Sequence, residues 1–445
     1  MRSTFGARLR AHRHAAGLTM EQLAEASGVS ARAISDMERG RSVAPQRRTV
    51  QALAGALALS EADRSTFLAG RTRAAPARPA SRCALPRPIA DFTGRGGELD
   101  RLGRVAALAR PAPAAAPVAT VSGVAGVGKT ALAVQAAHAL GERFPGGTFF
   151  LDLRGMHARP TGPGEALARL LAALGVPEGE TPVHDADRAG LYRDLLRGRP
   201  ALVVLDNAAD EAQVRPMLPG PGPSLTIVTS RRLLAGLDGV HRLSLGHLSA
   251  EDAAALLRSI VGVGPQRQAD AVREVVELCG RLPLALRIAG NRLTSRPQWS
   301  VRHLADRLAD ERRRLDQLTA GDLRLAAAFN LSYDQLSPSA RCLFRRLSLL
   351  PWPEFDARLA AVFGPAGPDD TEDALEELVE LSLLQAETNG RYRLHNLIRL
   401  FARQRLAEEE PAAAHDTAQR RPAAARDTAQ RRPAGRLPRR RALAG

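Results

Sequence analysis

The amino-acid sequence predicts a multidomain fold in which an all-α bundle precedes an α/β domain with a parallel sheet, which is followed by further helical domains. Three observations predict this order. Helix-capping residues recur through residues 5–68, short apolar runs alternate with helical patterns up to residue 248, and helical patterns dominate after it. A length of 445 residues fits about three domains. The expected ranges are 1–70 for the first bundle, 71–90 for a linker, 91–248 for the α/β domain, 249–320 for a helical domain, 321–410 for a winged helix and 411–445 for a basic tail.

The first bundle has the spacing of a helix-turn-helix unit. Thr19 is placed to cap a short amphipathic helix, Gly28 marks a turn, and Ser30 is placed to cap a second helix that stops at Gly40. Such a second helix is the one that enters the major groove of DNA. The side chains expected to face inward are Leu23, Val29, Ile34 and Met37. The candidate DNA contacts are the outward polar side chains Thr19, Gln22, Ser30, Arg32, Ser35 and Arg39.

The same segment resembles the lambda-repressor-like (XRE) family of DNA-binding domains. The resemblance covers about residues 5–68 and rests on Leu18-Thr19, Gln22-Leu23-Ala24, Gly28-Val29-Ser30, Ile34-Ser35 and Glu38-Arg39-Gly40. It implies double-stranded DNA as a partner, and an ion pair between Glu38 and Arg13 that serves structure and not readout. A generic five-helix bundle and a related domain that contacts protein are the alternatives.

The net charge of +16 lies at the two ends of the chain, because residues 91–410 are formally neutral. Basic ends suggest contact with a polyanion, and for the C-terminal end a solubilising disordered tail is an equal alternative. Residues 71–90 are rich in Pro, Arg and Ala and predict a linker, and residues 411–445 contain a near-repeat without large apolar residues. Few, scattered cysteines predict a cytoplasmic protein, and no apolar run approaches membrane length, so no membrane partner is expected. The predicted DNA binding adds an expected association with the nucleoid.

One motif in the middle of the chain carries most of the functional information. Lys129 is the only lysine in the sequence, and it lies in Gly123-Val-Ala-Gly-Val-Gly-Lys-Thr130, which has the phosphate-loop spacing G-x-x-x-x-G-K-[ST]. A short β-rich run, 119–122, precedes it and a helical pattern, 131–140, follows it, so a bound phosphate would lie at a helix N-terminus. The motif predicts a P-loop NTPase domain. Its expected nucleotide-binding residues are Gly123, Gly126, Val127, Gly128, Lys129, Thr130 and Ala131.

The chemistry of the motif assigns a role to each polar side chain. Lys129 can reach the β and γ phosphates, and the Thr130 hydroxyl can hold Mg²⁺. Asp206 ends an apolar run, and a carboxylate at the C-terminal edge of a parallel strand beside a phosphate loop can hold the same Mg²⁺. A buried aspartate with another role is the alternative. The other runs that predict buried strands are 147–153, 201–206, 224–229 and 241–245.

The remaining part of the chain predicts helices and one hairpin. Ser249 to Asp252 resembles a capping box that opens a helix. Asn389-Gly390 predicts a tight turn within 382–394, and a hairpin among helices is typical of a winged helix.

Several motifs together resemble the NB-ARC ATPases of the STAND signal-transduction class, over about residues 91–405. They are Phe92-Thr-Gly-Arg95, Thr229-Ser-Arg231, Gly280-Arg-Leu-Pro283 and Leu394-His395-Asn396, besides the phosphate loop. The resemblance implies that Arg95 lies by the adenine and ribose, and that Pro283 packs on the adenine. It also implies that Arg231 meets the γ phosphate as a catalytic residue, beside Lys129 and Asp206, and that His395 contacts the β phosphate of ADP.

The chain departs from the family pattern at three positions. Asn207 stands where many members carry a second acid, and because Asn cannot accept a proton, slow ATP hydrolysis is expected. Asn396 replaces an aspartate of the histidine motif, and Gly96 replaces a glutamate. Members usually carry a repeat sensor after the winged helix, so we expect a truncated form or sensing through a partner.

These features predict a DNA-binding transcriptional regulator switched by ATP and ADP, with nucleotide-dependent homo-oligomers implied by the resemblance. Three alternatives are open. The chain is a STAND signalling or defence protein whose N-terminal domain binds protein, a regulator that binds nucleotide without hydrolysis, or a metabolic P-loop enzyme that transfers phosphate.

Overall fold

The structure of the protein is a computed structural model that describes residues 5–39, 47–59, 63, 83–110, 115–262, 268–364 and 368–410. The chain forms two compact units, Met1–Ser81 and Arg82–Gly445. Each unit has its own hydrophobic core. The expected basic tail at 411–445 and residues 71–82 of the expected linker lie outside the described residues.

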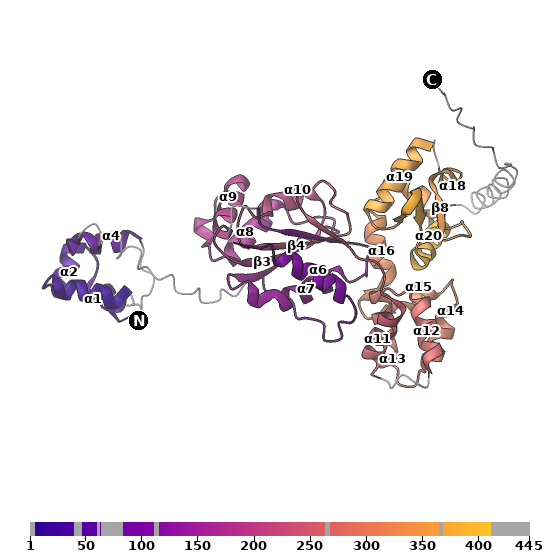
Figure 1. Cartoon of the computed structure of the whole chain (residues 1–445), viewed down its shortest axis with the longest axis horizontal. Coiled ribbons are helices and arrows are strands. Elements are labelled where there is room, and N and C mark those ends of the chain that lie inside the picture. The colour runs from indigo at the N-terminus through magenta and orange to yellow at the C-terminus, as the bar shows by residue number, and fades with distance from the viewer. Residues whose placement is uncertain are drawn as a thin grey trace, which may run out of the picture. The chain divides into compact units, whose positions relative to one another are not determined.

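The N-terminal unit, indigo in Figure 1, is a helical bundle that contains a helix-turn-helix. Gly28 adopts a left-handed conformation with φ 69°, which lets the chain turn sharply between the second and third helices. Leu23, Ile34 and Met37 are buried as predicted, whereas Val29 is only partly buried. The predicted stop at Gly40 lies outside the described residues. The helices are α1 (Phe5–Ala15), α2 (Met20–Ser27), α3 (Ala31–Glu38) and α4 (Arg47–Ala56).

Local hydrogen bonds fix the ends of these helices. The Thr19 hydroxyl accepts from the Gln22 N–H over 3.1 Å, and the Gln22 side chain accepts from the Thr19 N–H over 2.8 Å. This reciprocal pair is a capping box for α2. Arg13 donates to both carboxylate oxygens of Glu38, over 2.7 and 3.0 Å, and both side chains are nearly buried. The ion pair implied by the family resemblance is thus confirmed, and it ties α1 to α3.

The second unit is built around a parallel five-stranded sheet with the strand order β2-β3-β4-β1-β5. The predicted apolar runs closely match these strands. One difference is that β3 continues past Asp206, with a register shift after Leu205 and a left-handed Asn207 at φ 57°. The strands are β1 (Val118–Ser122), β2 (Gly147–Asp152), β3 (Ala201–Ala208), β4 (Leu225–Ser230) and β5 (His241–Ser244).

Helices cover both faces of this sheet, because successive side chains of a buried strand point to opposite faces. Leu202 and Val204 of β3 belong to the core beneath α6 and α7, and Val203 and Leu205 belong to the core beneath α8 and α9. The helices of this part are α6 (Gly96–Ala106), α7 (Lys129–Leu140), α8 (Pro163–Ala173), α9 (Asp185–Leu196) and α10 (Glu211–Val214), with short helical turns η1 (Gly141–Arg143), η2 (Glu178–Glu180) and η3 (Arg215–Met217).

The end of the expected linker packs against the sheet domain instead of standing free of it. Cys83 is buried, and its carbonyl accepts from the Phe150 N–H over 2.9 Å. The Pro86 carbonyl lies 2.8 Å from Nε2 of His138 on α7. Residues 83–90 therefore depart from the prediction, since Cys83 is buried and two backbone carbonyls contact the sheet domain although the Pro-rich composition is typical of a linker.

A helical domain follows the sheet, shown in salmon in Figure 1. The Ser249 hydroxyl accepts from the Asp252 N–H over 3.0 Å, so the predicted cap is confirmed. The helices are α11 (Ala250–Val261), α12 (Ala269–Leu278), α13 (Pro283–Thr294), α14 (Val301–Ala309) and α15 (Arg314–Gln317), followed by the short strands β6 (Thr319–Ala320) and β7 (Leu323–Arg324).

The last block is a winged helix with an antiparallel sheet of order β8-β10-β9. Asn389 and Gly390 both have positive φ, 63° and 68°, so the predicted hairpin turn is confirmed. Phe329, Tyr333, Phe344 and Phe401 form its aromatic core. The elements are α16 (Leu325–Tyr333), α17 (Pro338–Leu347), β8 (Glu354–Asp356), α18 (Ala357–Ala361), α19 (Pro368–Glu380), β9 (Gln385–Glu387), η5 (Thr388–Gly390), β10 (Arg391–Arg393) and α20 (Asn396–Glu409).

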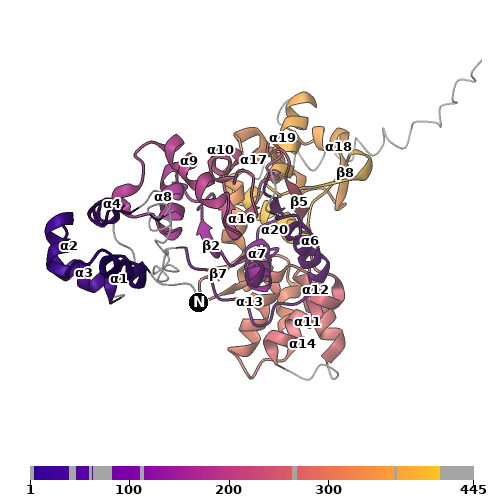
Figure 2. The ribbon, with the colours of Figure 1, turned by 60° about the vertical axis from the view of Figure 1, so that its left-hand side comes forward.

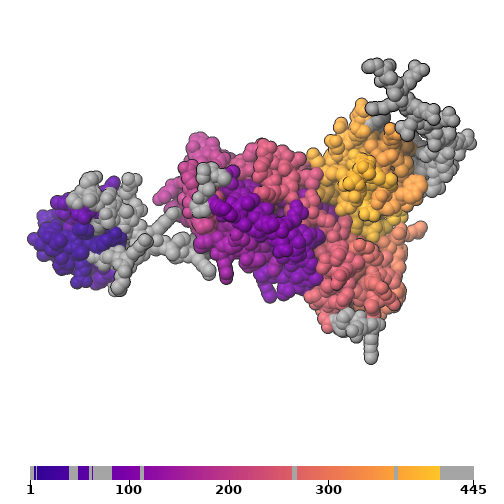
Figure 3. All heavy atoms as spheres, in the orientation of Figure 1, coloured from indigo at the N-terminus to yellow at the C-terminus, as the bar shows by residue number. Residues whose placement is uncertain are grey.

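The three parts of the second unit share one continuous core. A single hydrophobic cluster extends from α7 through α11–α13 to α20. Figure 2 shows α13 beside α11 in the helical domain, and the Leu284 N–H at the start of α13 donates to the carbonyl of Gly126 in the phosphate loop over 3.1 Å. The surface in Figure 3 shows the sheet, helical and winged-helix parts in direct contact. Within the described residues, no helix is long and apolar enough to cross a membrane.

Candidate nucleotide-binding site

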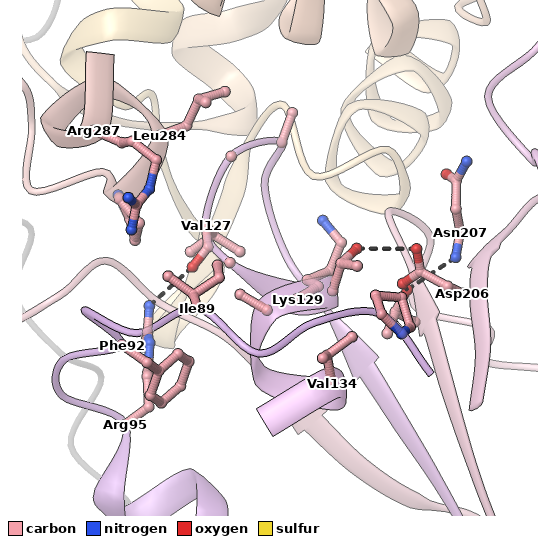
Figure 4. Close-up of a pocket in the computed structure, with 18 of the residues that line it drawn as sticks. Ile89, Phe92, Arg95, Val127, Lys129, Val134, Asp206, Asn207, Leu284 and Arg287 are labelled. Atoms are coloured by element: carbon pink, nitrogen blue, oxygen red, sulfur yellow. Dashed lines mark hydrogen bonds between the residues drawn. The ribbon is translucent and has the colours of Figure 1, made fainter. Parts of the chain in front are cut away.

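A cavity of about 550 Å³ lies at the C-terminal edge of the parallel sheet (Figure 4). Its walls come from the phosphate loop, the ends of β2, β3 and β4, residues 86–95 and the first turn of α13. The C-terminal edge of a parallel sheet is where α/β folds bind ligands, and the volume is typical of small-molecule sites.

The phosphate loop uses glycine conformations to curve around this cavity. Gly123, Gly126 and Gly128 have φ values of 143°, 80° and 99°. A Cβ at Gly123 would lie 2.7 Å from the Leu245 carbonyl oxygen, so no larger residue fits there without a shift of the backbone. Helix α7 begins at Lys129, two residues before the predicted start. All predicted loop residues except Gly123 line the cavity, and an anion there would meet the positive end of α7.

Lys129 lines the cavity and is partly buried. Its Nζ donates to the Gly123 carbonyl over 2.6 Å and to the Val124 carbonyl over 3.1 Å. Burial lowers the pKa of Lys129 to about 7, and the positive charge of Arg231 adds to this shift while Asp206 opposes it. A phosphate group would supply the anionic partner that this ammonium lacks.

Asp206 and Thr130 are adjacent, as the sequence predicts for a Mg²⁺ site. The Thr130 hydroxyl donates to Oδ2 of Asp206 over 3.1 Å, and the Thr229 hydroxyl donates to Oδ1 over 2.6 Å. Thr229 also accepts from the Asn207 N–H over 2.9 Å, which fixes its orientation. Burial raises the pKa of Asp206, so its ionised form needs a cation nearby. A hydroxyl and a carboxylate with hard oxygen atoms are ligands that suit Mg²⁺, and its charge would offset that of bound phosphates.

Arg231 connects the cavity to the winged helix. The side chain lines the cavity, and its Nη1 donates to the Ala328 carbonyl over 2.7 Å and to the Ser332 hydroxyl over 2.8 Å, both on α16. In return, the Ser382 hydroxyl donates to the Arg231 carbonyl over 2.6 Å. Burial lowers the pKa of Arg231 to about 10, which leaves it charged at neutral pH.

The other end of the cavity is apolar and suits a flat aromatic ring. Ile89, Phe92 and Leu284 lie around this end in Figure 4. The predicted residue Pro283 also lines the cavity.

Two arginines border the apolar end. Arg95 is left-handed at φ 66°, and its guanidinium binds Glu98 over 2.8 Å, the Gly246 carbonyl over 2.6 Å and the Val127 carbonyl over 3.3 Å. Arg287 makes a bidentate ion pair with Asp91, over 2.6 and 2.9 Å. Sequence reasoning missed the Asp91–Arg287 pair, because 196 positions separate its members and nothing local marks either one.

His395 does not line the cavity, so the structure does not bring it together with the other predicted nucleotide contacts. Its ring stacks on His247 with centroids 4.0 Å apart and an angle of 8°. Nδ1 accepts from the Leu397 N–H over 3.3 Å, which leaves Nε2 to donate to the Gly280 carbonyl over 3.0 Å. Burial lowers the pKa of His395 to about 4 and that of His247 to about 3, so both rings are neutral. A contact of His395 with ADP stays a prediction.

The predicted DNA contacts lie on the surface of the N-terminal unit. Arg32 is exposed and belongs to α3, and it forms no ion pair with any described residue. Ser30 accepts from the Ala33 N–H over 3.3 Å, and Arg39 donates to the backbone of Ser35 over 3.3 Å. The side chains of Thr19 and Gln22 form the capping box of α2. They would have to contact DNA while keeping these hydrogen bonds to the backbone. All of these are exposed except Ser35, which is partly buried.

Two domains of this chain match known domain families, and known regulatory proteins are similar to most of its length. Residues 4–67 match the helix-turn-helix domain family, and residues 336–407 match the winged helix-turn-helix domain family. The regulatory protein AfsR of Streptomyces coelicolor is 43% identical over 352 residues, which are 78% of this chain and 35% of AfsR. The AfsR of Streptomyces griseus is 44% identical over 322 residues, which are 72% of this chain and 33% of that protein.

The chain contains a helix-turn-helix domain and a winged helix-turn-helix domain, and it is similar to the AfsR regulatory proteins along most of its length. It spans about a third of the length of the curated relatives that it matches. Among solved structures, a Walker-type ATPase of Pyrococcus abyssi matches with a TM-score of 0.49 and 14% identity, over 71% of this chain and 98% of that one.

The cavity contains one further carboxylate, which sequence reasoning missed. Asp152 lines the cavity at the end of β2. The sequence does contain a signal for this residue, because Asp152 directly follows an apolar run, as Asp206 does.

Proposed function

We propose that the protein is a DNA-binding transcriptional regulator whose conformation is switched by ATP and ADP. The observation that carries the proposal is the position of Arg231, which lines the cavity and at the same time binds helix α16 of the winged helix. A γ phosphate beside Lys129 would attract the Arg231 guanidinium away from α16. ADP lacks that phosphate and would leave the contact in place.

The energies are of the right size for such a switch. Two hydrogen bonds from a charged guanidinium are worth about 3–6 kcal/mol together. Shifting a two-state equilibrium from 1:99 to 99:1 takes about 5.5 kcal/mol of differential binding. Breaking the contact of Arg231 with α16 therefore costs an energy of the same order as a complete switch, and the bonds from Arg231 to the γ phosphate would have to offset that cost.

The remaining roles follow the same arrangement. Lys129 and the loop residues would bind the phosphates, Thr130 and Asp206 would hold Mg²⁺, and the apolar end beside Pro283 and Arg95 would take the adenine. The N-terminal unit, with α3 in the major groove, would bind double-stranded DNA as an XRE-type domain. Such a regulator would act in the cytoplasm at the nucleoid, and it would assemble into homo-oligomers when ATP is bound. The similarity to AfsR, whose name describes a regulatory protein, supports this function.

The test uses the full chain with Lys129→Ala and, as a control, Arg197→Ala, whose side chain is 72% exposed. Isothermal titration with ATP and ADP should show a loss of affinity of about 100-fold or more for Lys129→Ala, because a buried charged contact to phosphate is removed. Arg197→Ala should bind as the unchanged protein does. Equal nucleotide affinity in Lys129→Ala would refute the nucleotide site.

DNA binding is tested in parallel. Genome-wide capture of DNA by the full chain, with and without Lys129, should recover a common set of sites whose occupancy depends on the lysine. Specific binding to a protein in place of DNA would favour a signalling role instead.

A further inference from the structure

Three carboxylates line the cavity, and two of them are already engaged. Asp91 is paired with Arg287 at the apolar end, and Asp206 accepts from Thr130 and Thr229. Asp152 is the third. It lies in register with Asp206, as its direct partner across the parallel pair of β2 and β3. It therefore lies at the phosphate end of the cavity.

The backbone after Asp152 is anchored to the end of β3. The Leu153 N–H donates to the Asp206 carbonyl over 2.8 Å, and the Gly155 N–H donates to the Asn207 carbonyl over 2.7 Å. A Cβ at Gly155 would lie 2.3 Å from the Ala209 nitrogen, so only glycine permits this approach. Asp152 is thus held in a fixed position relative to the proposed magnesium ligand.

One oxygen of Asp152 is free to accept a proton. Oδ1 accepts from the Arg154 N–H over 2.8 Å, and the other oxygen has no hydrogen-bond partner among the residues that the structure describes. The negative charge of Asp152 contributes to the raised pKa of Asp206, which shows that the two carboxyl groups are electrostatically close. Asn207, which follows Asp206, has an amide side chain that cannot take a proton.

We propose that Asp152 is the general base for ATP hydrolysis, a role that the amide of Asn207 cannot take. The inference rests on the proposed nucleotide function. A water oxygen attacks the γ phosphorus, and the bond from that phosphorus to the β–γ bridging oxygen breaks, with its electron pair staying on ADP. The water proton passes to the free oxygen of Asp152 and then to solvent. The products are ADP, inorganic phosphate and a proton.

The experiment measures single-turnover hydrolysis of ATP and, separately, the affinity for ATP and ADP in the presence of Mg²⁺. It compares the full chain with Asp152→Asn, with Asp152→Glu and with the double variant Asp152→Asn/Asn207→Asp. The control is Asp194→Asn, because Asp194 is an exposed aspartate of α9 whose side chain is 69% exposed.

Asp152→Asn should slow hydrolysis by about 100-fold or more, since general bases contribute on this scale, while nucleotide affinity changes by less than about threefold. Asp152→Glu and the double variant should hydrolyse ATP faster than Asp152→Asn does, because each carries a carboxylate at the C-terminal edge of the sheet. Asp194→Asn should be unaffected.

Four outcomes separate the two proposals. Unchanged hydrolysis in Asp152→Asn overturns the role of Asp152, as does a loss of nucleotide affinity in that variant. Binding of ATP by the unchanged chain without hydrolysis also overturns it, but leaves the nucleotide switch standing. An unchanged chain that binds neither ATP nor ADP refutes the proposed function itself.

Discussion

The Arg231 guanidinium lies 2.8 Å from the hydroxyl of Ser332, and this hydrogen bond joins the edge of the parallel sheet to the first helix of the winged helix. The two residues are 101 positions apart in the chain. Ser332 is fully buried, so its hydroxyl has no access to water as a substitute partner. The contact therefore depends on the two domains staying together, and it breaks if they separate.

Removing the hydroxyl of Ser332 should weaken this contact. Ser332→Ala takes away one of the two acceptors of Arg231 and leaves the Ala328 carbonyl. We expect the affinity for ATP relative to ADP to rise by about tenfold or more, since a hydrogen bond to a charged group is worth roughly 1.5–3 kcal/mol. Nucleotide titrations measure this ratio, with Ser339→Ala, an exposed serine of α17, as the matched control. A ratio that stays constant would show that Arg231 does not couple the site to α16.

The affinity for nucleotide should depend on pH through Lys129. Its pKa is about 7 in the empty site, so the ammonium is partly deprotonated at neutral pH and must regain a proton when phosphate binds. We expect ATP affinity to fall as pH rises above 7, with nearly one proton taken up per nucleotide near pH 8. Calorimetry in buffers of different ionisation enthalpy counts that proton. Lys129→Arg, which cannot deprotonate in this range, should abolish the proton uptake even where it still binds nucleotide.

Acid should destabilise the second unit through the stacked pair His247 and His395. In the folded state their pKa values are about 3 and about 4, whereas an unfolded histidine titrates near 6.5. The unfolded chain therefore binds more protons below pH 6.5, and the stability of the fold falls as pH decreases from there toward 4. Urea unfolding at a series of pH values measures the slope. Replacing His395 by Gln should reduce that slope, and an equal slope in the variant would contradict the assignment.

DNA binding should depend strongly on salt and on Arg32. Arginines that contact phosphates or bases release counterions, so affinity should decrease steeply between 50 and 200 mM salt, by roughly tenfold or more. Arg32→Ala should weaken binding to the preferred site by about 1–3 kcal/mol and reduce sequence preference, if it contacts a guanine. Arg10→Ala, an exposed arginine on α1, serves as the control. Fluorescence anisotropy with specific and random duplexes measures both effects, and a flat salt response would argue against DNA as the partner.

Much of the fold follows from local sequence patterns. The phosphate loop, the strands around it, the caps at Thr19 and Ser249 and the hairpin turn at Asn389 are all set by neighbours within a few positions. Their chemistry is complete in a short stretch of chain, because a turn needs glycine where φ is positive and a cap needs an oxygen at one position. The resemblance to known motifs added the Arg13–Glu38 pair, which the structure confirms.

The sequence by itself determined where a phosphate would bind and which segments form the sheet, since both depend on residue type and spacing. Only the tertiary structure decided which distant side chains share the cavity. It placed Asp152 beside Asp206, paired Asp91 with Arg287, and stacked His395 on His247 outside the cavity lining. These relationships arise from strand order and domain packing, in which residues far apart along the chain meet because burying a common core brings their backbones together.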